Sequence, residues 1–298
     1  MERIVGSQHL EVRYFERMAS SLGDKSRLLK YLPPIVDPQN PPKILDVGAG
    51  GGEFANALSL LGYYVVALDA SEEATNRIGF KFSNLETICA LANHTHDFGT
   101  NEFDVIICSS VLHEVFSYGD DVHKTGHVSS IVRALESFKQ ALKPGGKLLI
   151  RDGVLPNNWE ETASVQLLGD VPSSVVHTYL DMCPFSNGSA YGKQGTLVSL
   201  TETENKTFVG NVRSVLEFSY TYTWGLDSYP RETQELYAVM TLNEYKELLE
   251  SLGFKVDTAF SYLQPGYPEH LNGVLDLKVK GEPAEWFDSN AIWVAELK

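Results

Sequence analysis

The sequence has few cysteines and no long hydrophobic run. Its 298 residues include three cysteines, Cys89, Cys108 and Cys183, which are widely spaced and form no CxxC motif or Cys/His cluster. This spacing argues against a disulfide framework and a zinc site, so we expect no metal and three buried, apolar thiols. No stretch approaches the roughly 18 apolar residues that cross a bilayer, and the N-terminus is too charged for a signal peptide. We therefore expect a soluble, cytoplasmic protein without a membrane partner.

Runs of lysine or arginine are also missing. The chain has 24 Lys and Arg residues against 39 Asp and Glu residues, a formal net charge of −15. Residues 1–150 carry 14 basic and 18 acidic residues, whereas residues 151–298 carry 10 and 21. Nucleic-acid affinity rests largely on Lys and Arg that neutralise phosphates. The charge balance therefore argues against a nucleic-acid partner.

What the sequence does contain is an alternation of strand and helix patterns in its first half. The strand patterns are short and continuously apolar, as in a parallel sheet that is buried on both faces. Strands separated by helix-length segments predict an α/β, doubly wound, mostly parallel sheet. The predicted strands are 43–47, 63–69, 85–91, 103–110 and 147–152, and the predicted helices are 53–62, 71–83 and 127–143.

The alternation stops after residue 152 and returns near residue 241. A helix at 241–254 and strands at 255–263 and 290–297 bring the predicted sheet to seven strands. We therefore predict one Rossmann-like domain from 43–152 and 241–298. Residues 153–240 form a predicted substrate-binding lid, inserted between the fifth strand and the last helix. Residues 1–42 are predicted to be an N-terminal helical segment or lid, and 214–225 fits a helix and a strand equally well.

A glycine-rich turn joins the first predicted strand to the first predicted helix. Gly48, Gly50 and Gly52 alternate along it, which lets the backbone bend sharply and approach a ligand closely. Asp69 ends the second strand 19 residues after Gly50, where a carboxylate can accept hydrogen bonds from a ribose diol. This spacing also satisfies the dinucleotide pattern G-x-G-x-x-G/A. Asp46, however, would repel a pyrophosphate and suits a positive amino group.

These residues resemble the first motif, D/E-x-G-x-G-x-G, of the class I S-adenosylmethionine-dependent methyltransferases. Further matches follow in the family's order: the acid Asp69, the strand FDVI at 103–106 with VLH at 111–113, and the turn LKPGG at 142–146. The resemblance covers residues 40–152 well, 241–298 in general shape and 153–240 not at all. It implies a Rossmann-like methyltransferase fold and S-adenosyl-L-methionine as the cofactor.

The resemblance also implies roles for individual residues of the cofactor site. Asp46 and Gly48 are expected beside the methionine moiety, with Gly50 and Gly52 in the same loop. Asp69 is expected to hold the ribose hydroxyls, and Ser109 to line the floor near the sulfonium. The family's adenine contact after the third strand is often acidic, and here Asn93 and Asp97 are both candidates.

Candidate bases follow the fourth strand. His113 and Glu114 lie on the predicted cofactor side of the sheet, and a histidine accepts protons near neutral pH. Packing beside the cofactor is the alternative for His113, and a helix-start carboxylate that the helix dipole favours is the alternative for Glu114. Arg151 and Asp152 end the fifth strand and point in opposite directions, with an ion pair to a neighbouring helix as their structural role.

We therefore predict a methyltransferase that acts on an oxygen or nitrogen atom of a small or medium organic acceptor. The acidic second half of the chain favours a neutral or cationic acceptor. A protein or RNA acceptor, an NAD(P)-dependent oxidoreductase on the same core, and a nucleotide-binding module without activity remain alternatives.

Overall fold

The computed structural model describes residues 22–123, 125–187 and 196–298. These residues form two compact units. The first unit consists of residues 22–152, 243–260 and 291–298, and the second of the described parts of Gly153–Leu242 and Ser261–Asn290. Within these described ranges, no helix is long and apolar enough to cross a membrane.

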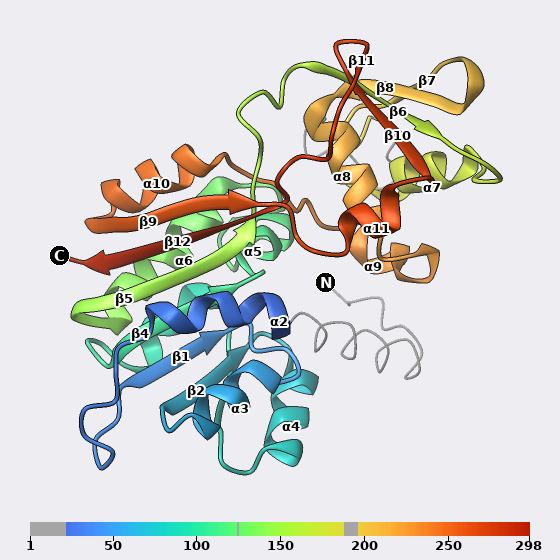
Figure 1. The fold of residues 1–298 in the computed structure, drawn as a ribbon. Helices are drawn as coiled ribbons and strands as arrows, with labels where there is room; N and C mark the ends of the chain where they lie inside the picture. Colours follow the sequence, from blue (N-terminus) through green and yellow to red (C-terminus); the bar gives the residue numbers. More distant parts are fainter. Residues whose placement is uncertain (1–21, 124, 188–195) are drawn as a thin grey trace. The chain divides into compact units, whose positions relative to one another are not determined.

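The first unit is built on a seven-stranded sheet with the order β3-β2-β1-β4-β5-β12-β9 (Figure 1). The pairs β2·β3, β1·β2, β1·β4 and β4·β5 are all parallel. This arrangement confirms the predicted doubly wound, Rossmann-like fold class. The strands are β1 (Lys43–Val47), β2 (Tyr64–Asp69), β3 (Glu86–Cys89), β4 (Phe103–Ser109), β5 (Leu142–Gly153), β9 (Phe254–Tyr262) and β12 (Asn290–Leu297).

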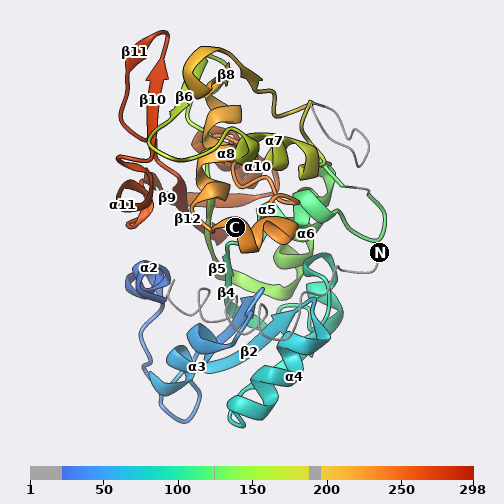
Figure 2. The same cartoon turned by 90° about the vertical axis from the view of Figure 1, so that its right-hand side faces the viewer.

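Helices cover both faces of this sheet. α2 and α3 lie together on one face, and α5 and α6 lie on the other (Figures 1 and 2). The helix predicted at 71–83 is α4, and Ser71 caps it, since the Ser71 hydroxyl accepts a hydrogen bond from Ala74 N. The helices are α2 (Leu22–Lys25), η1 (Ser26–Tyr31), α3 (Glu53–Leu60), α4 (Glu72–Lys81), η2 (Ala92–Phe98), α5 (Leu112–Tyr118), α6 (Val128–Ala141) and α10 (Leu242–Ser251).

The central strands of this sheet are buried because their residues are almost all apolar. Ile106, Ile107 and Cys108 of β4 have no exposed surface, as a strand covered on both faces requires. The expectation of three buried thiols is wrong for Cys89, which is exposed at the end of the edge strand β3. Cys183, in the second unit, is buried as expected.

The second unit has its own sheet of five strands in the order β11-β10-β6-β8-β7, with antiparallel pairs. Segment 214–225, which sequence alone left open, is helical over most of its length. Asn211 caps α8 by accepting a hydrogen bond of 2.9 Å from Ser214 N. The elements are β6 (Thr162–Leu167), α7 (Ser174–Met182), β7 (Thr201–Glu202), η3 (Glu204–Lys206), β8 (Thr207–Asn211), α8 (Val212–Tyr222), η4 (Leu226–Ser228), α9 (Tyr229–Glu232), α11 (Tyr267–Leu271), β10 (Leu275–Val279) and β11 (Glu282–Pro283).

The two units differ in two respects from the division predicted from sequence. Residues 261–290 group with the second unit, although they follow α10 in the chain. The reason is the antiparallel pairing of β10 with β6, in which Leu277 lies opposite Val165. At the other end of the chain, α2 and η1 belong to the first unit. Residues 1–21 of the predicted N-terminal segment lie outside the described residues.

Candidate functional site

Several of the predicted site residues lie at the carboxyl ends of neighbouring strands. The register pairs Asp46 of β1 with Ala67 of β2 and with Ile107 of β4, so these three strands end at the same edge. Ser109 is the last residue of β4, and Asp69 is the last residue of β2. The fold therefore brings Asp46, Asp69 and Ser109 to the edge at which parallel α/β sheets bind their ligands.

The glycine-rich turn is fastened to the end of β2. Gly48 N and Ala49 N donate to Leu68 O at 2.7 and 3.0 Å, and Gly50 N donates to the Asp69 carboxylate at 2.8 Å. Gly48 has a φ of +70°, and a Cβ there would lie 2.2 Å from Cγ2 of Val111, just before α5. The turn thus depends on glycine both for its backbone conformation and for its close approach to Val111.

Asp69 has a structural role besides its predicted contact with ribose. Its Oδ2 accepts the bond from Gly50 N, and its Oδ1 accepts from Ser71 N at 2.8 Å. The carboxylate therefore holds the glycine turn and the start of α4 in place. A carboxylate oxygen can accept more than one hydrogen bond, so the ribose contact stays compatible with this role and remains a prediction.

Two polar atoms at the same edge are buried without a hydrogen-bond partner among the described residues. They are Oδ2 of Asp46 and Oγ of Ser109, in side chains that are only 2% and 3% exposed. Burial raises the pKa of Asp46 to about 6, although Lys25 opposes the shift. Buried polar atoms normally have partners, so both atoms suit a polar ligand. The Asp46 carboxylate in particular fits the amino group of an amino acid.

The edge continues into a buried pair formed by Asp152 and His113. Asp152 Oδ1 lies 2.6 Å from His113 Nδ1, and Oδ2 accepts from the backbone N–H groups of Val111 and Leu112 at 3.1 and 2.7 Å. The Asp152 carboxylate thus holds the start of α5 with one oxygen and orients the His113 imidazole with the other. A proton donated from Nδ1 leaves Nε2 as the basic nitrogen.

Sequence reasoning did not find this role for Asp152. The interaction joins residues that are 39 positions apart, and no local pattern links them. The alternation of side chains along β5 is the one available signal, because it sends Arg151 and Asp152 to opposite faces. Arg151 pairs with Asp24 of α2, which is the predicted ion pair with a neighbouring helix. Glu114 lies in the first turn of α5 and is half-buried, and its role remains a prediction.

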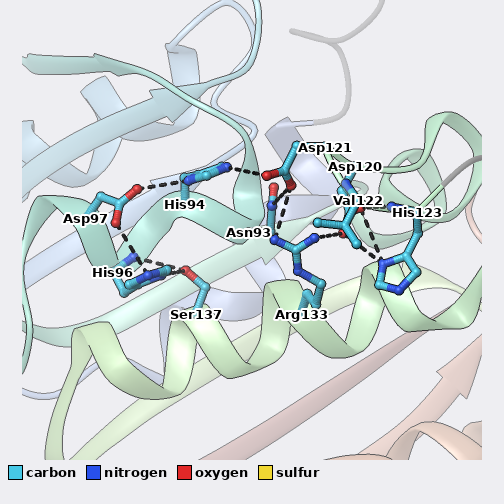
Figure 3. A network of polar contacts seen from close by, with 10 residues as sticks. All are labelled: Asn93, His94, His96, Asp97, Asp120, Asp121, Val122, His123, Arg133 and Ser137. Atoms are coloured by element: carbon cyan, nitrogen blue, oxygen red, sulfur yellow. Dashed lines mark hydrogen bonds and ion pairs between the residues drawn. The ribbon is translucent and has the colours of Figure 1, made fainter.

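The two adenine candidates, Asn93 and Asp97, differ in their surroundings (Figure 3). Asn93 is buried, and its amide donates to Asp121 Oδ1 at 2.6 Å. Asp97 is exposed and faces two histidines of its own turn, with His94 Nδ1 at 2.9 Å and His96 Nε2 at 3.4 Å. Both adenine contacts remain predictions, and the burial of Asn93 favours it over Asp97.

A comparison with protein families identifies the family of proteins in which this ligand-binding edge occurs. Residues 14–259 match the family described as "Methyltransferase domain". The chain belongs to this family. The predicted resemblance is thereby confirmed, and the oxidoreductase alternative is set aside. S-adenosylmethionine is the cofactor of this class of methyltransferases, and the buried Asp46 carboxylate at the glycine turn fits its amino-acid end.

Two curated relatives carry methyltransferase names. The chain is 32% identical over 117 residues to an uncharacterized methyltransferase from Synechocystis sp., covering 39% of this chain and 50% of the relative. It is 30% identical over 151 residues to a ubiquinone biosynthesis O-methyltransferase from Rickettsia prowazekii, covering 48% of this chain and 47% of the relative. The chain thus spans about half the length of the curated relatives it matches.

Solved structures share the fold at low sequence identity. An S-adenosylmethionine-dependent methyltransferase from Mesorhizobium loti aligns with a TM-score of 0.51 at 16% identity, covering 91% of this chain and 95% of that one. A methyltransferase of the same class from Methanosarcina mazei also gives 0.51, at 15% identity, covering 91% and 96%. These likenesses show the fold alone.

Proposed function

We propose that this methyltransferase transfers a methyl group from S-adenosylmethionine to an oxygen or nitrogen atom of a small or medium organic acceptor. The buried hydrogen bond between His113 and Asp152 carries the proposal, because it provides an oriented imidazole at the cofactor edge. The name of the Rickettsia prowazekii relative, a ubiquinone biosynthesis O-methyltransferase, supports a small acceptor and an oxygen nucleophile.

In this reaction the protein has two tasks, which are to orient the acceptor and the cofactor and to take up one proton. S-adenosylmethionine supplies a methyl group that its sulfonium already activates. Asp46, Gly48 and Asp69 hold the cofactor in this proposal, and Ser109 lines the floor beneath the reacting groups. Nε2 of His113 accepts the proton that the acceptor loses as its new bond to the methyl group forms. Ordered encounters of this kind gain about 7–11 kcal/mol from positioning, and a general base adds about 100- to 10,000-fold in rate.

The charge of the chain favours a neutral or cationic acceptor. Residues 151–298 carry 21 acidic and 10 basic residues, and these residues include all described elements of the second unit. A phosphate polymer would be repelled by such a balance, whereas an amine or a neutral phenol would not. The predicted substrate-binding role of residues 153–240 belongs to this proposal.

Labelled cofactor tests the class of acceptor directly. The protein is incubated with S-adenosylmethionine carrying a radioactive methyl group and with fractionated cell extract. We expect the label in an organic-soluble or low-molecular-mass product. Label recovered instead in precipitated protein or in RNA would overturn the small-molecule acceptor and identify the alternative class.

His113 is tested by its replacement with asparagine. An asparagine keeps a donor near the position of Nδ1 for Asp152 but removes Nε2. For His113→Asn we expect kcat to fall by about 100- to 10,000-fold, while affinity for S-adenosylhomocysteine measured by calorimetry changes little. The exposed His127 supplies a matched control, and His127→Asn should leave kcat unchanged. Activity of His113→Asn close to that of the parent protein would remove His113 as the base, and Glu114→Gln then tests the second candidate.

A further inference from the structure

Ser110, the residue that follows β4, has a backbone conformation that side chains rarely adopt. Its φ is +60°, in the left-handed region that favours glycine. It joins Ser109, the last residue of β4, to Val111, the N-cap of α5. Strained residues of this kind persist only where their surroundings hold them, and they cluster at functional sites. The turn between β4 and α5 therefore needs a group that fixes it.

Arg151, near the carboxyl end of β5, holds Ser110 by both its backbone and its side chain. Ser110 N donates to the backbone carbonyl of Arg151 at 2.7 Å, and Nη1 of Arg151 donates to the Ser110 hydroxyl at 2.6 Å. The guanidinium is 2% exposed, so water competes little for these bonds. Asp24 of α2 holds the guanidinium in turn, because its Oδ2 accepts from Nε at 2.5 Å and pairs with Nη2. Asp24, Arg151 and Ser110 thus form a bridge from α2 to the turn.

The next residue of β5 holds the other side of the same turn. Asp152 points to the opposite face from Arg151, accepts from Leu112 N at 2.7 Å and lies 2.6 Å from His113 Nδ1. The end of β5 therefore holds the chain twice in succession, at Ser110 and at the start of α5. Because these segments are consecutive, a change of φ at Ser110 would redirect the start of α5 and move His113 away from Asp152.

We propose that Arg151 is a positioning residue, which Asp24 holds in place and which fixes the left-handed turn at Ser110, so that His113 stays against Asp152. The inference rests on the proposed function, in which His113 is the base, and it names the groups that control the position of that base. It also gives α2 a part in the reaction, because the bridge is complete only when α2 is in place. A displacement of about 1 Å in a reacting group can cost about 100-fold in rate.

The test separates the Ser110 hydroxyl from the backbone conformation that it helps to hold. Ser110→Ala and Ser110→Gly both lose the bond from Arg151, but glycine adopts the left-handed conformation readily. We expect Ser110→Ala to lower the initial rate of label transfer from radioactive S-adenosylmethionine in cell extract by about 10- to 100-fold, and Ser110→Gly to stay within about threefold of the parent protein. Affinity for S-adenosylhomocysteine, measured by calorimetry, should stay within about twofold in both variants and shows that they are folded.

The Nδ1 proton of His113 supplies a readout that needs no acceptor. Its hydrogen bond with Asp152 slows exchange with solvent, so we expect a low-field proton NMR line in the parent protein and in Ser110→Gly that is lost in Ser110→Ala. His113→Asn assigns the line by removing it.

Asp24→Asn tests the other end of the bridge. It weakens the hold on Arg151, so we expect a lower rate and a weaker line, both of which recover in the double variant with Ser110→Gly. Asp37→Asn is the matched control, since Asp37 is an exposed acid of the same N-terminal segment, and it should change neither.

The two readouts distinguish the outcomes. A rate and a line in Ser110→Ala equal to those of the parent protein would overturn the positioning role. Equal losses in Ser110→Ala and Ser110→Gly would overturn it as well, and would show that the hydroxyl contacts a ligand directly. If the line behaves as expected but His113→Asn keeps its activity, the bridge is supported and the proposed base is wrong. A parent protein without the line would overturn the hydrogen bond between His113 and Asp152, and both proposals with it.

Discussion

At the scale of single residues, Asp46 combines a carboxylate with a buried position that disfavours its charged form. Burial is the largest cause that raises its pKa to about 6, and the nearby Asp69 adds to the effect while Lys25 reduces it. The raised pKa means that the folded protein holds this carboxylate ionised at neutral pH at a cost in stability. The group that fits the cofactor is therefore one that the fold alone would not favour.

Asp46→Asn should make the cofactor-free protein more stable at neutral pH. A folded pKa above the unfolded one penalises folding at any pH above the unfolded pKa, and the penalty shrinks as the pH falls through the folded value. Between an ordinary pKa of 3.8 and about 6, the penalty reaches up to about 3 kcal/mol near pH 7.5 and about 1 kcal/mol near pH 4.5. Urea unfolding at both pH values measures the gap between the variant and the parent protein. A gap that does not narrow at the lower pH would contradict this account.

Gly48 allows a second prediction at this scale. Gly48→Ala brings a methyl group within 2.2 Å of Val111 Cγ2 at a φ of +70°, so we expect a loss of about 2–4 kcal/mol in the free energy of unfolding. The double variant with Val111→Ala removes the clashing atom and keeps only the backbone strain, about 1–2 kcal/mol, together with the cavity left at Val111. Chemical denaturation of both single variants and the double variant gives the coupling energy. If the loss in the double variant equals the sum of the two single losses, the contact with Val111 is not the reason why residue 48 must be glycine.

At the scale of elements, η2 is joined to α6 and to the segment after α5 by a polar network (Figure 3). His96 N donates to the Ser137 hydroxyl of α6 at 3.0 Å, and Arg133 of the same helix reaches Asp121 Oδ1 at 3.2 Å. His94 Nε2 lies 3.4 Å from Asp121 Oδ2, and the other oxygen of that carboxylate accepts from Asn93. The network thus links the buried adenine candidate to groups that titrate.

His94 should titrate above the ordinary value for histidine. Its hydrogen bond to Asp97 is the largest cause that raises its pKa above 6.5, and Asp121 contributes as well. A raised folded pKa adds stability that is fully present below the unfolded pKa and disappears as the pH rises through the folded one. Proton NMR titration of the His94 ring should give a midpoint above 6.5, which Asp97→Asn lowers. A midpoint at or below 6.5 in the parent protein would contradict the observed pairing.

Element types could be predicted where the sequence pattern is local. Continuous apolar runs were sufficient for β1, β2 and β4, the helix predicted at 71–83 is α4, and the strand predicted at 290–297 is β12. The sequence could not decide between a helix and a strand at 214–225 because both faces of the segment carry apolar residues. The residue that favours a helix, the N-cap Asn211, precedes the segment. In the site, the strand ends were predictable, but Asp152 owes its role to partners that are distant in the chain, His113 and the start of α5.

At the scale of the whole molecule, the second unit depends on pairing between distant segments. Its sheet joins β6, β8 and β10, and β10 follows β8 only after α8, α10 and β9 have intervened. The sequence of β10 contains no pattern that would predict its pairing with β6. Its alternating pattern, with Leu275 and Leu277 buried, is that of any strand with one covered face.

Leu277→Ala should therefore loosen the second unit and spare the first. Leu277 is 3% exposed and lies opposite Val165, and removing such a buried leucine costs about 2–5 kcal/mol. Hydrogen exchange should become faster in β6 and β8 and stay unchanged in β1 and β4. Lys278→Ala, on the other face of the same strand, is the control and should change neither. Faster exchange in both sheets to the same degree would contradict the division into two units.

The positions of β10 and β12 determine how late each sheet can be completed during synthesis. β10 lies between β11 and β6, and β12 lies between β5 and β9. Both are inner strands, so neither sheet can be completed before its late strand is added. Until residues 275–297 have left the ribosome, β6 and β5 each lack a neighbour. Unpaired strand edges in nascent chains invite aggregation. We expect the nascent chain to need protection by chaperones until residues 275–297 have emerged and paired.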